Sequence, residues 1–192
     1  MLLINPTLRK GDGDGCYVCV TIISLLHQHA GAISEELGLI AWPKSDGIVQ
    51  LLQIENGASI GCELEIRHDD AATINSRGAL HSKQQLGVLL QACWGSAAIN
   101  PTILALSYST AVVLWSITQR GKQITKSLGC IIHPPKKTRL IGWHPTSIAC
   151  LLAISSVADI TIYQTSHITA PVALYTIPSP SGATLESWAW DR

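Results

Sequence analysis

The sequence predicts an all-β fold, an incomplete β-propeller with about three sheets and the start of a fourth. Apolar residues make up 47% of the 192 residues and charged residues only 14%. Ile, Val, Leu, Thr and Trp are abundant while Phe is absent, which favours strands over helices. Trp94, Trp143 and Trp190 follow one another at intervals of 49 and 47 residues. Intervals of this length filled with short strands are typical of propeller blades, small antiparallel sheets that bury their faces by stacking.

The N-terminal segment, residues 1–32, is expected to be irregular. Its longest apolar run, CYVCVTIISLL at residues 16–26, is too short to span a bilayer, so no transmembrane segment is expected. The GDGDG stretch before that run argues against a secretory signal. Six scattered cysteines do not resemble the framework of a disulfide-rich secreted domain, and we therefore expect an intracellular protein.

The first repeat unit is expected at residues 33–78. Within it, LGLIAWPKSDGIVQLLQI at residues 37–54 contains two apolar runs separated by KSDG. An Asp-Gly pair between two such runs is a strong hairpin signal, and it places the turn at Asp46 and Gly47.

The second and third units, residues 79–127 and 128–182, share one pattern. The second reads WGSAAINPTILALSYSTAVVLWSI from Trp94, and the third reads WHPTSIACLLAISSVADITIYQT from Trp143. Each passes a proline and then runs through ILALS or LLAIS, which predicts an interior strand that is apolar on both faces. The alternating stretches AVVLWSI and DITIYQT predict the next strand of each unit. ESWAWDR then opens a fourth unit at residues 183–192.

These stretches resemble WD40 repeats and, more narrowly, the coronin family. RLIGWHPTSIACLLAISSVADITIYQT is similar to a coronin blade, SWAWDR to the start of the next blade, and GLIAWPKSDGIVQLLQI to the first blade of the long coronins with tandem propellers. The pair Cys16-Tyr17 stands where many coronins have the same two residues. The resemblance implies a cytoplasmic, cytoskeleton-associated scaffold that binds actin filaments or vesicle-traffic proteins. A complete seven-bladed propeller needs roughly 300 residues, so we expect the remaining blades from a longer chain or a partner.

The chain departs from the WD40 pattern at several positions. The Trp-Asp dipeptide is replaced by Trp115-Ser116 and by Tyr163-Gln164. The resemblance implies that the third unit keeps a buried hydrogen bond between Asp159 and His133. The residues expected to hold the blades together are Trp94, Trp115, His133, Trp143, Asp159, Tyr163 and Trp190.

Two basic loops, QRGKQITK and HPPKKTR, are the candidate partner-binding segments. In a propeller they would lie on a rim, where acidic actin or phosphoinositide surfaces are candidate targets. Through the same loops the protein could also contact a membrane peripherally. Ordinary solvated loops are the alternative. The net charge of zero gives no support for nucleic-acid binding. The candidate partner-binding residues are Arg120, Lys122, Lys126, Lys136, Lys137 and Arg139.

Two further patterns match those of catalytic or metal-binding sites. Gly57-Ala58-Ser59-Ile60-Gly61 matches a hydrolase nucleophile elbow, but the following CELEIR predicts a strand where the elbow needs a helix, which favours a hairpin turn. Cys16, Cys19, His27 and His29 have zinc-ligand chemistry, although their spacing favours buried thiols. We therefore predict no enzyme activity, cofactor or metal. A WD40 adaptor without actin binding and a hydrolase that uses Ser59 are the alternatives.

Overall fold

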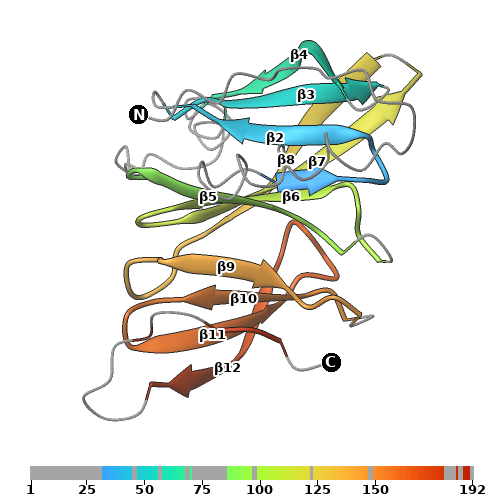
Figure 1. Ribbon diagram of the computed structural model, residues 1–192. Coiled ribbons are helices and arrows are strands. Elements are labelled where there is room, and N and C mark those ends of the chain that lie inside the picture. The colour runs from blue at the N-terminus through green and yellow to red at the C-terminus, as the bar shows by residue number, and fades with distance from the viewer. Residues whose placement is uncertain are drawn as a thin grey trace, which may run out of the picture.

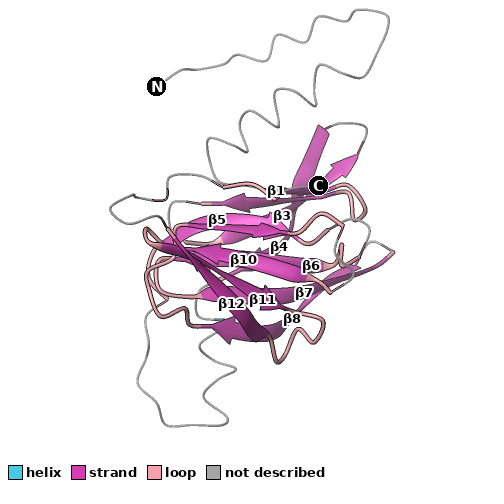
Figure 2. Cartoon of the chain, turned by 90° about the horizontal axis from the view of Figure 1, so that it is seen from below, coloured by secondary structure: helices cyan, strands magenta, loops and turns pink. Residues whose placement is uncertain are grey.

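The described part of the chain folds as three four-stranded antiparallel sheets, and every element in it is a strand (Figures 1 and 2). This confirms the predicted all-β class, and the arrangement is compatible with a β-propeller-like fold. The computed structural model describes residues 32–44, 47–55, 58–67, 70, 86–96, 99–121, 123–146, 149–179, 185 and 188–190.

The first sheet contains strands in the order β1-β2-β3-β4. The predicted hairpin is confirmed, with β2 and β3 paired from Leu39↔Gln53 to Pro43↔Val49. Gly47 closes the turn, since its N–H donates to the Lys44 carbonyl at 3.1 Å, and its φ of 78° is a left-handed conformation that glycine adopts without steric cost. Asp46, the other predicted turn residue, lies outside the described residues. The four strands are β1 (Ala32–Ser34), β2 (Leu39–Pro43), β3 (Val49–Glu55) and β4 (Ala58–Ile66).

The second sheet has the order β5-β6-β7-β8 and corrects one predicted boundary. We placed the end of the second unit at residue 127, but β8 continues past it and pairs with β7 as far as Val112↔Ile132. The second unit therefore extends to residue 132. Its strands are β5 (Leu89–Trp94), β6 (Ile103–Tyr108), β7 (Val112–Arg120) and β8 (Gln123–Ile132).

The third sheet repeats the same meander, and its strands are hydrogen-bonded in the order β9-β10-β11-β12. The LLAIS stretch forms β10, which is buried at four of its five positions, as expected for an interior strand. The outer strand differs, because all seven residues of β12 are exposed. The strands are β9 (Leu140–Trp143), β10 (Leu151–Ser155), β11 (Asp159–Gln164) and β12 (Val172–Pro178).

The three sheets stack face to face, with the second sheet in the middle (Figure 1). Leu104 and Leu106 of β6 pack in the core shared with the first sheet, while Ala105 between them packs in the core shared with the third. Because successive side chains of a strand point to opposite faces, a strand in the middle of the stack is apolar at every position. This accounts for the unbroken ILALS run.

Tryptophan side chains tie each sheet to the one before it. The Trp94 indole N–H donates to the Ala32 carbonyl oxygen at 3.2 Å, which joins β5 to β1. The Trp143 indole donates to the Cys93 carbonyl at 3.2 Å, which joins β9 to β5. Trp190 makes the same contact with the Gly142 carbonyl of β9 at 3.3 Å. The regular interval between tryptophans therefore reflects one repeated contact between successive sheets.

The end of the chain covers part of the outer face of the third sheet. A Cβ atom on Gly142 would lie 2.6 Å from Cη2 of Trp188, so only glycine fits beneath this ring. Trp190 packs edge-on against Trp188, with ring centroids 5.9 Å apart, and also contacts the His144 ring at 4.7 Å. Residues 188–190 thus lie against β9 of the third sheet, in the same way that β9 lies against β5 of the second.

Candidate functional site

Loops of the second and third sheets meet at one end of the strands. We call this surface the loop rim and define it as residues 86–88, 109–110, 133–140, 156–158 and 185. Ser109 donates its N–H to the Val88 carbonyl at 2.9 Å, and its own carbonyl accepts the N–H of Thr138 at 3.1 Å. The Arg139 N–H reaches the Ser155 carbonyl at 2.8 Å. Backbone hydrogen bonds therefore connect the loops of two sheets into one surface.

The segment that leads from β8 to β9 carries most of the charge of the loop rim. Lys136 pairs with the Asp159 carboxylate, with 2.5 Å between Nζ and Oδ2. The Ser156 hydroxyl donates to the other Asp159 oxygen at 2.6 Å. These hydrogen bonds from Lys136 and Ser156 lower the pKa of Asp159 below its ordinary value, against the opposing effect of burial. Asp159 is thus ionised at neutral pH and neutralises one lysine.

The implied hydrogen bond between Asp159 and His133 is wrong. His133 is exposed where β8 ends, and the carboxylate is held by Lys136 and Ser156 instead. The lysine comes from the connecting segment that crosses the end of the third sheet, so the carboxylate is stabilised by an ion pair at the surface. His133 therefore does not hold the blades together as a buried donor.

Two other cations of the loop rim face solvent. Lys137 and Arg139 are both exposed, and Nη1 of Arg139 donates to the Leu185 carbonyl at 2.9 Å. Leu185 in turn donates its N–H to the Val157 carbonyl at 3.0 Å, so Arg139 is anchored beside the turn between β10 and β11. The predicted partner-binding residues Lys136, Lys137 and Arg139 therefore lie together on one surface.

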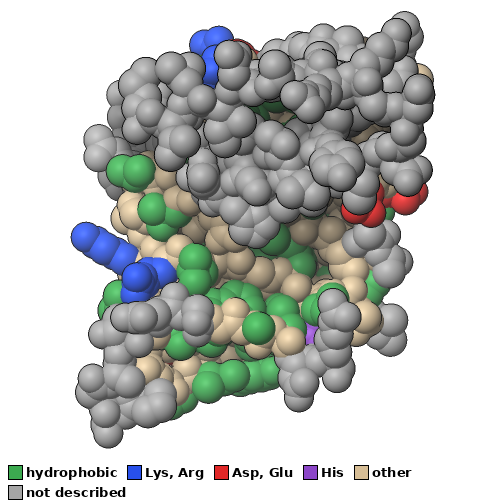
Figure 3. All heavy atoms as spheres, in the orientation of Figure 1, with side chains coloured by type: hydrophobic (Ala, Val, Ile, Leu, Met, Phe, Trp, Pro, Cys, Tyr) green, Lys and Arg blue, Asp and Glu red, His purple; other side chains and the backbone are tan. Residues whose placement is uncertain are grey.

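Aliphatic side chains are exposed among these cations. Val88 is 71% exposed, Val157 53% and Leu140 36%. Val88 precedes β5, Leu140 begins β9 and Val157 lies in the turn before β11, so all three belong to the loop rim. Figure 3 shows Lys and Arg side chains near hydrophobic ones at the left edge, about halfway down the molecule.

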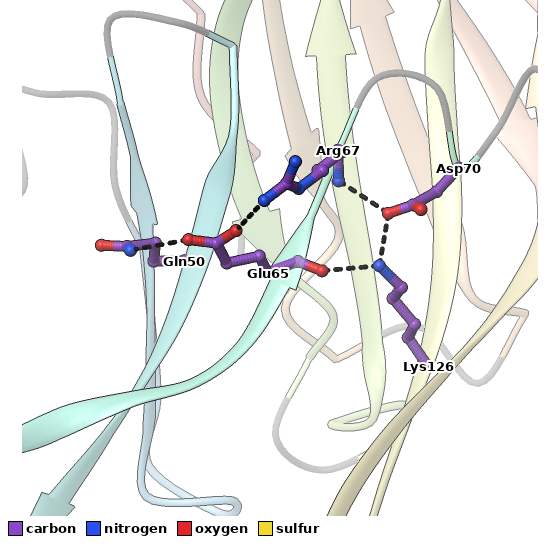
Figure 4. Close-up of polar contacts among 5 residues, drawn as sticks. All are labelled: Gln50, Glu65, Arg67, Asp70 and Lys126. Atoms are coloured by element: carbon purple, nitrogen blue, oxygen red, sulfur yellow. Dashed lines mark hydrogen bonds and ion pairs between the residues drawn. The ribbon is translucent and has the colours of Figure 1, made fainter.

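Lys126 was expected to bind a partner, but its side chain ties two sheets of the chain together. It lies on β8, and its ammonium donates to the Glu65 carbonyl of β4 at 2.5 Å and pairs with the Asp70 carboxylate (Figure 4). It also lies 5.7 Å from the centre of the Trp115 ring, within range of a cation–π contact. The side chain is only 20% exposed, so it is committed to the junction of the first and second sheets.

The carboxylates of this junction are stabilised in their ionised form. Hydrogen bonds from Gln50 and Arg67 lower the pKa of Glu65. Burial raises the pKa of Asp70, but hydrogen bonds from Lys126 and the Arg67 backbone, together with the positive charge of both residues, outweigh burial and lower it. The network therefore fastens the outer strands of the two sheets at neutral pH.

The other predicted residues are separated from the loop rim or lie outside the described residues. Arg120 is exposed at the end of β7, at the opposite end of the second sheet. Trp115 is buried in the core between the first and second sheets, and Tyr163 in the core between the second and third. Lys122 and the candidate zinc ligands Cys16, Cys19, His27 and His29 lie outside the described residues.

The candidate nucleophile Ser59 falls in a strand. Ser59 lies within β4, paired with Ile54 of β3, so its backbone is part of a strand and not of a strand-to-helix turn. No group of three His, Cys, Asp or Glu side chains that could hold a metal ion occurs among the described residues. The described residues also contain no helix with the length and apolar character needed to cross a membrane.

No protein-family model matches the chain, and no curated protein matches it significantly. The resemblance to coronins therefore remains an expectation from the sequence.

Proposed function

We propose that the chain is part of a WD40-type β-propeller that acts as a non-catalytic scaffold of the coronin kind. In this proposal it binds actin filaments, or other proteins of the cytoskeleton and vesicle traffic, in the cytoplasm. The observation that carries the propeller assignment is the contact made by Trp94, Trp143 and Trp190. Each indole donates to a backbone carbonyl in the first strand of the preceding sheet. A contact repeated in this way is what blades stacked around an axis require.

The outer face of the third sheet supports the presence of a further blade. Ile132 pairs with Val112 and is 6% exposed, since the third sheet covers that face of the second. Ile177 pairs with Ile160 at the matching position of the third sheet and is 49% exposed. The same face is therefore covered in one sheet and open in the next. A fourth sheet that continues from Trp190, supplied by a longer chain or a partner, would cover it.

The loop rim supports the scaffold function. The rim presents exposed cations and aliphatic side chains on loops that backbone hydrogen bonds fix to one another. Such a surface suits contact with another protein, because long side chains at a rim can adapt to a partner while the strands beneath stay rigid. The actin assignment rests on the resemblance of the sequence to coronins.

Co-sedimentation with filamentous actin tests this proposal. We expect the chain to pellet with filaments at low salt and to be released as salt rises, because the charges involved are exposed and screened. Soluble globular actin at the same concentration controls for filament dependence. A chain that stays in the supernatant at low salt would contradict the coronin assignment and favour a WD40 adaptor without actin binding.

A further inference from the structure

We propose that the loop rim binds a short acidic peptide segment that carries aliphatic side chains. The binding residues are Lys137 and Arg139 for carboxylates, and Val88, Leu140 and Val157 for the aliphatic side chains. The inference rests on the proposed scaffold function, since it names the chemistry of the partner, but it does not require that the partner be actin.

The charge of the loop rim selects an acidic partner. Lys136 is neutralised by Asp159, whose carboxylate also accepts a hydrogen bond from Ser156. The described residues of the loop rim itself contain no carboxylate, and Asp159 lies beside the rim at the start of β11. Among the described residues, Lys137 and Arg139 therefore carry two positive charges that no carboxylate neutralises. A guanidinium has donors beyond the one that reaches the Leu185 carbonyl, and its planar fork suits a carboxylate.

The exposed aliphatic side chains add an apolar requirement. Val88, Leu140 and Val157 are exposed beside the cations, and their backbones belong to the same hydrogen-bonded set of loops. Leu140 donates its N–H to the Ser155 hydroxyl at 3.1 Å, and the Val157 carbonyl is held by Leu185. Because these loops are already fixed, a ligand would lose little free energy in ordering them. A ligand that carries only carboxylates would leave Val88, Leu140 and Val157 exposed to water, whereas a ligand with aliphatic side chains would cover them.

A peptide fits this surface better than a membrane does. Each basic residue near an anionic membrane contributes only about 1 kcal/mol, so two uncompensated cations give weak attachment. The exposed apolar residues are valine and leucine, without the tryptophan or tyrosine that typically anchors a protein at a lipid interface. A peptide can instead place a carboxylate on Arg139 and an aliphatic side chain on Val157. These two residues lie close together because both hydrogen-bond to the backbone of Leu185.

Fluorescence anisotropy with labelled peptides tests the inference. The probe is a short peptide in which glutamates alternate with leucines, and its controls replace the glutamates with lysines or the leucines with serines. We expect the Glu-Leu peptide to bind at low salt and both control peptides to bind at least about tenfold more weakly. The double substitution Lys137→Glu and Arg139→Glu should weaken binding of the Glu-Leu peptide at least about tenfold, since charged contacts become repulsive.

Matched variants separate binding from folding. Arg120→Glu makes an equal change of charge at the opposite end of the second sheet, and it should leave peptide binding unchanged. Lys137→Glu alone removes a side chain for which the structure gives no hydrogen bond, so its circular dichroism and melting curve should match the parent. Val157→Ser should weaken binding of the Glu-Leu peptide but not of the Glu-Ser peptide.

The outcomes distinguish this inference from the proposed function. Peptide binding that depends on the loop rim, without actin co-sedimentation, supports the inference and contradicts the actin assignment. Actin co-sedimentation without peptide binding overturns the inference about the peptide, while the proposed scaffold function is retained. Equal peptide binding by the parent and by Lys137→Glu/Arg139→Glu also overturns it. Binding to phosphatidylserine vesicles, lost in the same double variant while the peptide does not bind, would assign the surface to a membrane instead.

Discussion

Trp143→Phe tests whether the repeated indole contact holds the sheets together. Trp143 is almost fully buried, and its indole N–H donates to the Cys93 carbonyl of the neighbouring sheet. Phenylalanine keeps most of the packing but removes the donor. Losing a hydrogen bond to a buried acceptor costs about 1–3 kcal/mol. The smaller ring also buries less apolar surface, which costs roughly 1 kcal/mol more. We expect the free energy of unfolding to fall by about 2–4 kcal/mol.

Urea unfolding followed by circular dichroism in the β-sheet region measures this change. The midpoint should shift while the dependence on urea concentration stays constant, because the same surface is exposed on unfolding. Tyr175→Phe is the matched control, since Tyr175 is 52% exposed on β12 of the same sheet and its substitution should change stability by less than about 0.5 kcal/mol. A Trp143→Phe variant as stable as this control would refute the structural role of the indole contact.

Three other perturbations follow from the structure. Lys126→Met should lower the free energy of unfolding by about 1–2 kcal/mol, because it leaves the Asp70 carboxylate without its ammonium partner; urea unfolding measures this, and no change would contradict the inter-sheet tie. Gly142→Ala should lower the melting temperature and alter the tryptophan fluorescence spectrum of the folded protein, since the new methyl group overlaps the Trp188 ring. A melting temperature and a spectrum equal to those of the parent would contradict this contact. Acid should destabilise the protein, because the pKa values of Asp70 and Asp159 are lowered by folding: their contribution is present above the unfolded value of about 4 and is lost as pH falls through the folded values. Urea midpoints from pH 7 to 3 measure this, and Asp159→Asn should reduce the slope.

The sequence alone predicted the all-β class and several of the strands, among them β2, β3, β6, β7, β10 and β11. The Asp-Gly turn between β2 and β3, the apolar run of β6 and β10, and the alternation in β11 are local signals, and local signals determine local structure. The tryptophan interval is also a sequence property, and Trp190 repeats the backbone contact of Trp94 and Trp143, while the opening of a fourth unit stays a prediction. The end of the second unit was placed too early, at residue 127, because QITKSLGCII mixes polar and apolar residues without strict alternation.

Only the tertiary structure decided the roles of the charged residues. Lys126 and Lys137 are both lysines in short basic stretches, and no feature of their neighbours in sequence separates them. Lys126 meets Asp70 because the second sheet stacks on the first, whereas Lys137 faces solvent at the loop rim. Likewise, Asp159 pairs with Lys136 and not His133, because the path of the β8–β9 connection brings the lysine to it. Strand formation depends on neighbours along the chain, while the environment of a charge depends on which distant segment packs against it.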